Sequence, residues 1–231
     1  LYCCKQIPLR KGEQDMPEYN FDEYIDRTGS NSIKHAFKKE YHVPEDVIPL
    51  WVATWISRSP KRRSVTGIAE AGKFGIFGYA GVHDDYFEAI HAWMLKRHGW
   101  DVKEEWMVRI PGVVCAIATA VRALTKEGDG VMIMQPVYHP FKNVLVANNR
   151  KVVKHCLKTG EDGRFHIDFQ EMERQIAEED VKMLVLCTPH NPGGVSGIRK
   201  SLEDRRYLSA PSGLCVADEI HHDFILPGHT F

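Results

Sequence analysis

The sequence predicts an α/β fold in which a largely parallel sheet is flanked by helices. Apolar runs with the length of buried strands alternate with helical patterns along the second half of the chain. With 231 residues, of which 43% are hydrophobic and 26% charged, the chain can bury a substantial core. Two of the apolar runs end in polar side chains, and open α/β sheets bind ligands at the carboxyl ends of their strands.

The first predicted elements are helical. A polar stretch of mixed composition indicates an extended N-terminal arm with a helix near residues 32–41. Asp84 or Asp85 can cap a second helix, which has one apolar face and ends at Gly99. The stretches 54–65 and 201–212 lose clean periodicity, which suggests that the reading frame is corrupted in both.

The later elements alternate between strand and helix. Asp168 and Glu171 have the spacing of a capping box, so a helix is expected to begin there with Phe169, Met172 and Ile176 facing inward. A short strand, a long apolar helix and four further strands are predicted, in that order, at residues 107–110, 113–126, 131–135, 152–157, 181–188 and 214–218.

Charge and composition disfavour several classes of protein. The formal net charge of −1 produces no overall field that would attract nucleic acid or an anionic membrane. No apolar stretch approaches the roughly 20 residues that a membrane-spanning helix needs. The six cysteines show no C-x-x-C spacing, so reduced thiols and a cytoplasmic location are expected. Four of them lie in apolar segments, where a free thiol is expected to pack as a small hydrophobic side chain: Cys115, Cys156, Cys187 and Cys215.

Two polar residues at predicted strand ends are the main candidates for a binding site. Asn191 follows the strand at 181–188, and Asp218 ends the strand at 214–218. A carboxylate can keep a pyridine nitrogen protonated, and an amide can donate a hydrogen bond to an oxygen on the same ring. Singly, Asp218 would more often cap a helix or pair with a cation, and Asn191 would usually form only a turn. Together they favour a site for a heteroaromatic cofactor.

A phosphorylated cofactor would find two further partners. Tyr138 follows a predicted strand and can stack on the ring, although a core tyrosine is an equal alternative. Gly112, Val113 and Val114 open the long apolar helix, and backbone N–H groups at a helix N-terminus bind phosphate. A glycine before a helix is by itself a weak signal.

A metal site is a competing interpretation of His221 and His222, with Asp218 or Asp223 as a third ligand. Adjacent residues on a strand point to opposite faces, so one ion cannot easily bind both histidines. We therefore expect no metal site here. A nicotinamide-binding domain is also disfavoured, because the chain lacks the G-x-G-x-x-G turn.

In this order, the features resemble the fold-type I pyridoxal-phosphate (PLP) enzymes of the aminotransferase class I/II superfamily. Five segments look like the cystathionine β-lyase branch of MalY-like and PatB-like proteins: residues 48–53, 75–79, 111–114, 135–138 and 218–223. The resemblance implies the aspartate aminotransferase fold, PLP as the cofactor and an amino acid as the substrate. It further implies β-elimination from cystathionine or cysteine S-conjugates to a thiol, ammonia and pyruvate.

The resemblance also implies two roles that local patterns do not suggest. Members of this family are homodimers, in which Tyr79 of the neighbouring subunit would reach the cofactor phosphate. His221 would lie near the 3′ oxygen of the ring. Neither nucleic acid nor a membrane is expected as a partner.

One departure from the family concerns the lysine that binds the cofactor covalently. Relatives carry this lysine a few tens of residues after the position of Asp218, and none of residues 219–231 is lysine. No catalytic residue is therefore assigned, and the chain is expected to be truncated before that lysine and inactive. An aminotransferase is an alternative within the enzyme class, and a decayed homologue that serves only as a binding or dimerisation partner is an alternative outside it.

The resemblance also sets the expected domains. Residues 1–15 are expected to be extraneous or disordered, and residues 16–53 to form the N-terminal arm. Residues 54–231 would form an incomplete PLP-binding large domain, without the small C-terminal domain.

Overall fold

The computed structural model describes residues 20, 22–27, 30, 32–40, 42–44, 46–53, 65–79, 81–82, 84–194, 214–224 and 228. The chain divides into two compact units, Leu1–Gly81 and Val82–Phe231, which are described separately. The predicted boundary between residues 53 and 54 borders a segment outside the described residues and stays a prediction. The two aperiodic stretches, apart from Val65, also lie outside them.

Two helices are described in the first unit. Helix α1 (Ile33–Glu40) lies within the range predicted for the N-terminal arm. Helix α2 (Thr66–Phe74) was not predicted. It ends where Gly75 adopts a φ of 67° and donates its N–H to the carbonyl oxygen of Ala71. None of the residues of α2 is buried.

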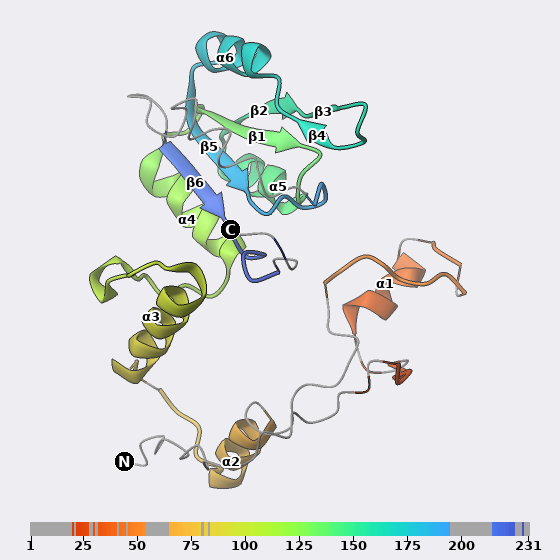
Figure 1. Ribbon diagram of the computed structural model, residues 1–231, viewed down its shortest axis with the longest axis vertical. Helices are drawn as coiled ribbons and strands as arrows, with labels where there is room; N and C mark the ends of the chain where they lie inside the picture. Colours follow the sequence, from red (N-terminus) through yellow and green to blue (C-terminus); the bar gives the residue numbers. More distant parts are fainter. Residues whose placement is uncertain are drawn as a thin grey trace. The chain divides into compact units, whose positions relative to one another are not determined.

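The second unit is built on a four-stranded sheet that confirms the predicted α/β fold (Figure 1). Its strands lie in the order β2 (Lys151–Cys156), β1 (Gly130–Gln135), β5 (Val181–Cys187) and β6 (Leu214–Asp218). All three pairings are parallel. The four strands agree with the predicted ranges to within one residue.

The helices of this unit include both predicted and unexpected elements. Helices α3 (Asp84–His98), α4 (Val113–Leu124) and α6 (Phe169–Glu178) confirm the three that were predicted. Helix α5 (Pro140–Ala147), the short η2 (Glu104–Trp106) and the hairpin of β3 (Lys158–Thr159) and β4 (Phe165–His166) were missed. The signal for α5 was present, because a proline at the first helical position precedes an apolar face.

The core lies in two layers, one on each face of the sheet. In β1, Met132 and Met134 contact one apolar cluster, whereas Val131 and Ile133 contact the other. This alternation is the two-residue period of a strand that is buried on both faces. Helix α6 covers the first face with Met172, and helices α4 and α5 cover the second (Figure 1).

The strand order identifies the edge of the sheet where a ligand would bind. From β1 the chain passes through α5 to the neighbouring β2, and then crosses back over β1 to enter β5. The strand order therefore reverses between β1 and β5. Ligands of open α/β sheets bind outside the carboxyl ends of the strands at such a reversal.

Three sequence expectations are corrected. Residues 107–110 are not a strand, because no described strand is hydrogen-bonded to them, and Val108 is 85% exposed. Asp168 does cap α6 by accepting the N–H of Glu171, but the Glu171 carboxylate binds Arg174 and no return bond of a capping box is formed. Cys115 is exposed rather than packed in the core, and so is Cys156.

Helix α4 ends two residues earlier than predicted, at Leu124, and Arg150 explains how its end is stabilised. The guanidinium group donates to the carbonyl oxygens of Thr125 and Val121 at 2.7 and 3.3 Å, and to the Thr125 hydroxyl at 3.0 Å. The Val121 carbonyl oxygen also accepts the Thr125 N–H, whereas the carbonyl groups that follow it have no partner within the helix. A cation at this end also interacts favourably with the helix dipole. Among the described helices, none is long and apolar enough to cross a membrane.

Candidate functional site

Asp218 lies at the carboxyl end of β6, next to the end of β5. The parallel register pairs Asp218 with Cys187, the last residue of β5. The Thr188 N–H donates to the Asp218 carbonyl oxygen at 2.9 Å, and the Ile220 N–H donates to Oδ1 of its side chain at 3.1 Å. Only 5% of Asp218 is exposed. The backbone of Asp218 is therefore tied to the end of β5, and its carboxylate is oriented by the backbone N–H two residues later.

Asn191 lies in the turn that follows β5, and this turn is tied to the end of β1. The Tyr138 N–H donates to the Asn191 carbonyl oxygen at 3.0 Å. The Asn191 N–H in turn donates to Sγ of Cys187 at 3.4 Å. The loops that leave β1 and β5 are thus joined directly at the reversal of strand order. Tyr138, Asn191 and Asp218 are gathered at one edge of the sheet, as the sequence predicted.

His190 anchors the turn from beneath. It is buried, its Nε2 lies 3.3 Å from the Met134 carbonyl oxygen, and its Nδ1 accepts the N–H of Gly193 at 3.2 Å. Since a carbonyl oxygen can only accept, Nε2 carries the proton and Nδ1 is free to accept. Burial lowers the pKa of His190 and raises the pKa of the Cys187 thiol, so both side chains are held neutral. Sequence reasoning missed this anchor, because its partner Met134 is 56 residues away.

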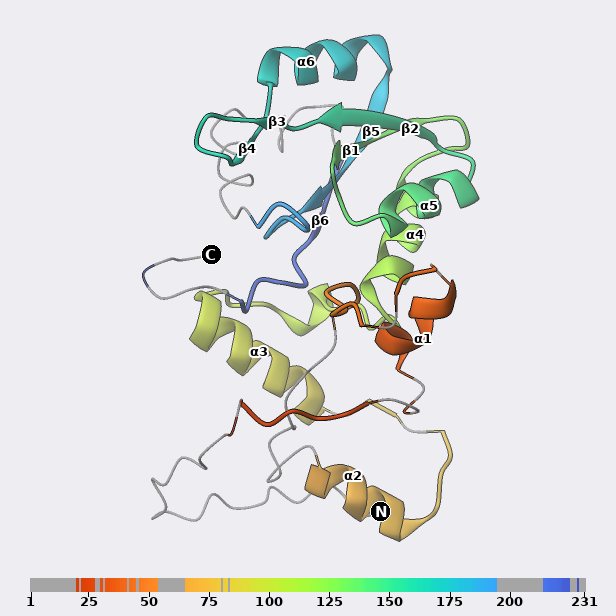
Figure 2. The same ribbon diagram turned by 90° about the vertical axis from the view of Figure 1, so that its right-hand side faces the viewer.

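Helix α4 brings its N-terminus to the same edge. It lies beside β6 and runs in the opposite direction, so its first turn is at the end of the sheet that holds Asp218 (Figure 1 and Figure 2). Gly112 caps the helix with a φ of 141°, a conformation that favours glycine, and no side chain caps it. The first backbone N–H groups, which include those of Val113 and Val114, have no acceptor within the helix. They are free to bind an anion.

The other predicted site residues are placed as follows. Tyr138 is 38% exposed, and its ring contacts those of His139 and Phe141. His221 lies in the turn after β6, partly buried, with its ring 6.1 Å from that of Phe224. The premise that His221 and His222 alternate on a strand was therefore wrong. Tyr79 belongs to the first unit and is fully exposed there.

The residues fit a cationic heteroaromatic ring with a phosphate. A buried carboxylate is normally paired with a cation, yet no lysine, arginine or histidine pairs with Asp218 in the described part of the chain. A protonated pyridine nitrogen would supply that charge. The uncapped N-terminus of α4 offers the donors that a phosphate needs at the same end of the sheet. Both charged ends of the cofactor thus have a complementary group.

Comparison with known proteins agrees with this arrangement. The profile of the aminotransferase class I and II family matches residues 44–231. Cystathionine β-lyase PatB of Bacillus subtilis (strain 168) is 37% identical over 212 residues, which are 91% of this chain and 54% of that protein.

Solved structures are similarly close. Cystalysin from Treponema denticola, which contains a pyridoxal 5′-phosphate cofactor, is 33% identical with a TM-score of 0.82, over 92% of this chain and 54% of that one. The PLP-bound C–S lyase of Staphylococcus hominis is 29% identical with a TM-score of 0.83, over the same shares. The chain spans about half the length of the curated relatives it matches.

Proposed function

Because this chain belongs to the aminotransferase class I and II family, we propose that it supplies the PLP-binding part of a carbon–sulfur β-lyase. The substrate of the complete protein would be cystathionine or another cysteine S-conjugate, and its products a thiol, ammonia and pyruvate. The observation that carries the proposal is the buried Asp218 carboxylate beside the Asn191 turn, where the strand order reverses.

Each of the gathered residues would have one task. Asp218 would keep the proton on the pyridine nitrogen, because a buried carboxylate favours a bound positive charge. The side-chain amide of Asn191 would donate to the ring oxygen, and Tyr138 would stack on the ring. Backbone N–H groups at Gly112, Val113 and Val114 would bind the phosphate. When bound, PLP supplies an electron sink for chemistry at the substrate Cα.

Two assignments rest on the family resemblance alone. His221 would lie near the ring oxygen that Asn191 also binds. Tyr79 would reach the phosphate of a neighbouring subunit in a homodimer. The free thiols of the four described cysteines fit the reducing environment of the cytoplasm.

The lyase is favoured over an aminotransferase by the named relatives, PatB and the C–S lyase of Staphylococcus hominis. The family itself includes aminotransferases, so an aminotransferase is the second candidate activity. The two activities differ in their products. The complete protein, given cystathionine, should release a thiol and ammonia without a 2-oxo acid acceptor. Transfer of the amino group to an added 2-oxo acid, without thiol release, would establish the aminotransferase instead.

Cofactor binding can be tested on the 231-residue chain itself. We expect PLP to bind without a covalent bond, so that dialysis removes it even after borohydride treatment. Asp218→Asn should weaken binding at least tenfold, because a neutral amide cannot hold the ring nitrogen protonated. Asp180→Asn is the matched control: this exposed aspartate lies directly before β5, at the opposite end of the sheet. Equal PLP affinity of the two variants would contradict the assignment of Asp218.

A further inference from the structure

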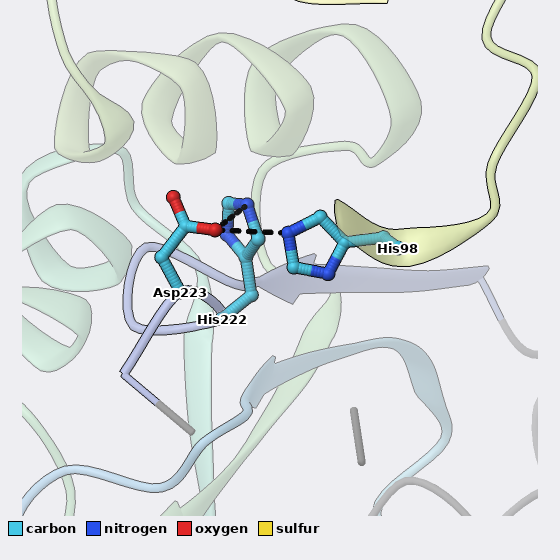
Figure 3. A group of neighbouring side chains, drawn as sticks. All are labelled: His98, His222 and Asp223. Carbon is cyan, nitrogen blue, oxygen red and sulfur yellow. Dashed lines mark hydrogen bonds and ion pairs between the residues drawn. The ribbon is translucent and has the colours of Figure 1, made fainter. Parts of the chain in front are cut away.

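Three side chains from two distant parts of the chain meet at the turn that follows β6 (Figure 3). His98 is the last residue of α3, and His222 and Asp223 lie in the turn. One nitrogen of each histidine and one carboxylate oxygen all lie within 4.8 Å of one another. From this geometry we propose that His98, His222 and Asp223 form a binding site for a divalent transition-metal ion, with Zn²⁺ as the best match.

The separations between the candidate ligand atoms suit such an ion. Nε2 of His98 lies 2.9 Å from Oδ1 of Asp223, and Nε2 of His222 lies 3.8 Å from the same oxygen. Zinc bonds to nitrogen and oxygen of about 2.0–2.2 Å, in a tetrahedral arrangement, place neighbouring ligand atoms ~3.3 Å apart. The two separations lie on either side of this value, so small side-chain rotations would complete the site.

The groups behind the ligands orient them as metal ligands usually are. Nδ1 of His222 lies 2.5 Å from the Glu219 carbonyl oxygen, which can only accept a hydrogen bond. Nδ1 therefore carries the proton, and the neutral ring presents the Nε2 lone pair to the cluster. The indole N–H of Trp93 donates to both carboxylate oxygens of Asp223, at 3.2 Å each. Hydrogen bonds of this kind fix the orientation of metal-ligating histidine and carboxylate side chains.

The cluster contains a second histidine, which a hydrogen-bonded link between α3 and the turn would not need. The His98–Asp223 pair alone would tie α3 to the turn. The second imidazole is directed at the same carboxylate oxygen, and its ring centre is 4.6 Å from that of His98. Two imidazoles and a carboxylate are a ligand set of zinc sites, in which a water molecule takes the fourth position. The two histidine side chains are largely sheltered, at 12% and 25% exposed, whereas the Asp223 side chain is 37% exposed.

The bound ion would fix the turn relative to α3. His222 is four residues after Asp218 and directly follows His221, so the ion would restrain the segment that carries both of these residues. The proposal does not depend on PLP binding, because none of the three ligands is among the residues assigned to the cofactor.

The test uses the 231-residue chain, freed of metal with EDTA and then titrated with Zn²⁺ by calorimetry and with Co²⁺ by visible absorption. We expect one sheltered site, which gives the intense Co²⁺ absorption of four- or fivefold coordination and a raised melting temperature with Zn²⁺. His222→Gln and Asp223→Asn, each checked for folding by circular dichroism, should lower the Zn²⁺ affinity at least tenfold.

The matched control is His91→Gln. His91 lies on the same helix as His98, and its Nε2 lies 2.8 Å from Oδ1 of Asp101. Both side chains are well exposed, and among the described residues this pair has no third metal-ligating side chain beside it. This variant should bind Zn²⁺ as the unmodified chain does. A weak octahedral Co²⁺ spectrum from the unmodified chain would overturn the proposal, whether or not the variants fold. So would an unchanged Zn²⁺ affinity in both ligand variants.

Discussion

Replacement of Gly193 by alanine tests how the turn that carries Asn191 is held. A Cβ at Gly193 would lie 2.8 Å from Nδ1 of His190 and 2.8 Å from Cδ2 of Phe165. Ordinary contacts begin at 3.4 Å, so each approach is about 0.6 Å too close. His190 is buried and hydrogen-bonded to Met134, and Phe165 packs against the core. Neither ring can move away easily, and the turn itself must shift.

The expected magnitude follows from two opposing effects. Overpacking of a confined site costs about 1–3 kcal/mol of unfolding free energy. The lower backbone entropy of alanine in the unfolded chain offsets about 0.4–1 kcal/mol of this. The difference between the midpoints of these two ranges gives a net loss for Gly193→Ala of about 1.3 kcal/mol. Because Asn191 is two residues away, its displacement should also weaken PLP binding. The PLP affinity should fall about tenfold for each 1.4 kcal/mol of binding free energy that is lost.

Gly194→Ala separates displacement of the turn from simple destabilisation. Gly194 has a φ of 62°, and a Cβ there would meet no atom within 4 Å. Alanine in this left-handed conformation costs roughly 1–2 kcal/mol without pushing on a neighbour. Urea denaturation should therefore find similar losses for both variants, whereas PLP titration should find weaker binding only for Gly193→Ala. If Gly193→Ala is as stable as the unmodified chain and binds PLP equally well, the turn is not confined as described.

Three further predictions concern stability. Arg150→Met should lower the unfolding free energy by about 1.5–3 kcal/mol, because carbonyl groups at the end of α4 lose a charged donor. In urea denaturation, a loss of less than about 0.5 kcal/mol would contradict this prediction. Phe141→Ala, on the buried face of α5, should lower the unfolding free energy by about 3–5 kcal/mol. Val146→Ala, on the exposed face of the same helix, should change the unfolding free energy by about 0.5 kcal/mol or less. Burial lowers the pKa of His190 below its ordinary value of about 6.5, so the unfolded chain binds a proton that the folded chain does not. The unfolding free energy should therefore fall as the pH drops below about 6.5, down to the lower folded pKa, and a His190→Gln chain that keeps the same dependence would refute this cause.

The sequence alone determined the strands of the sheet and which polar residues lie at or just after their ends. β6 was predicted at its observed bounds, because its apolar residues form a continuous run that ends at Asp218, and that information is local. The same holds for the beginning of α6, where Asp168 caps the helix within three residues of itself. Asn191 and Asp218 were found because each directly follows or ends such a run.

Residues 107–110 show why local patterns have limits. Their apolar character satisfied the pattern of a strand, but a strand also needs a hydrogen-bonded neighbour, and no described strand pairs with them. Backbone hydrogen bonds in a sheet come from other parts of the chain. Whether a short apolar segment becomes a strand is therefore decided by what lies beside it, which the segment itself does not encode.

The tertiary structure decided which distant residues meet. The order of the strands places the loops after β1 and β5 together, where the Tyr138 N–H reaches the Asn191 carbonyl oxygen. The packing of α3 against the turn after β6 also brings His98 next to Asp223, which is 125 residues later in the chain. The sequence had offered His222 and Asp223 as metal ligands only with their immediate neighbours. Local patterns record which residues are buried or capped, whereas contacts of this range depend on how complete elements pack, and only the folded chain specifies that.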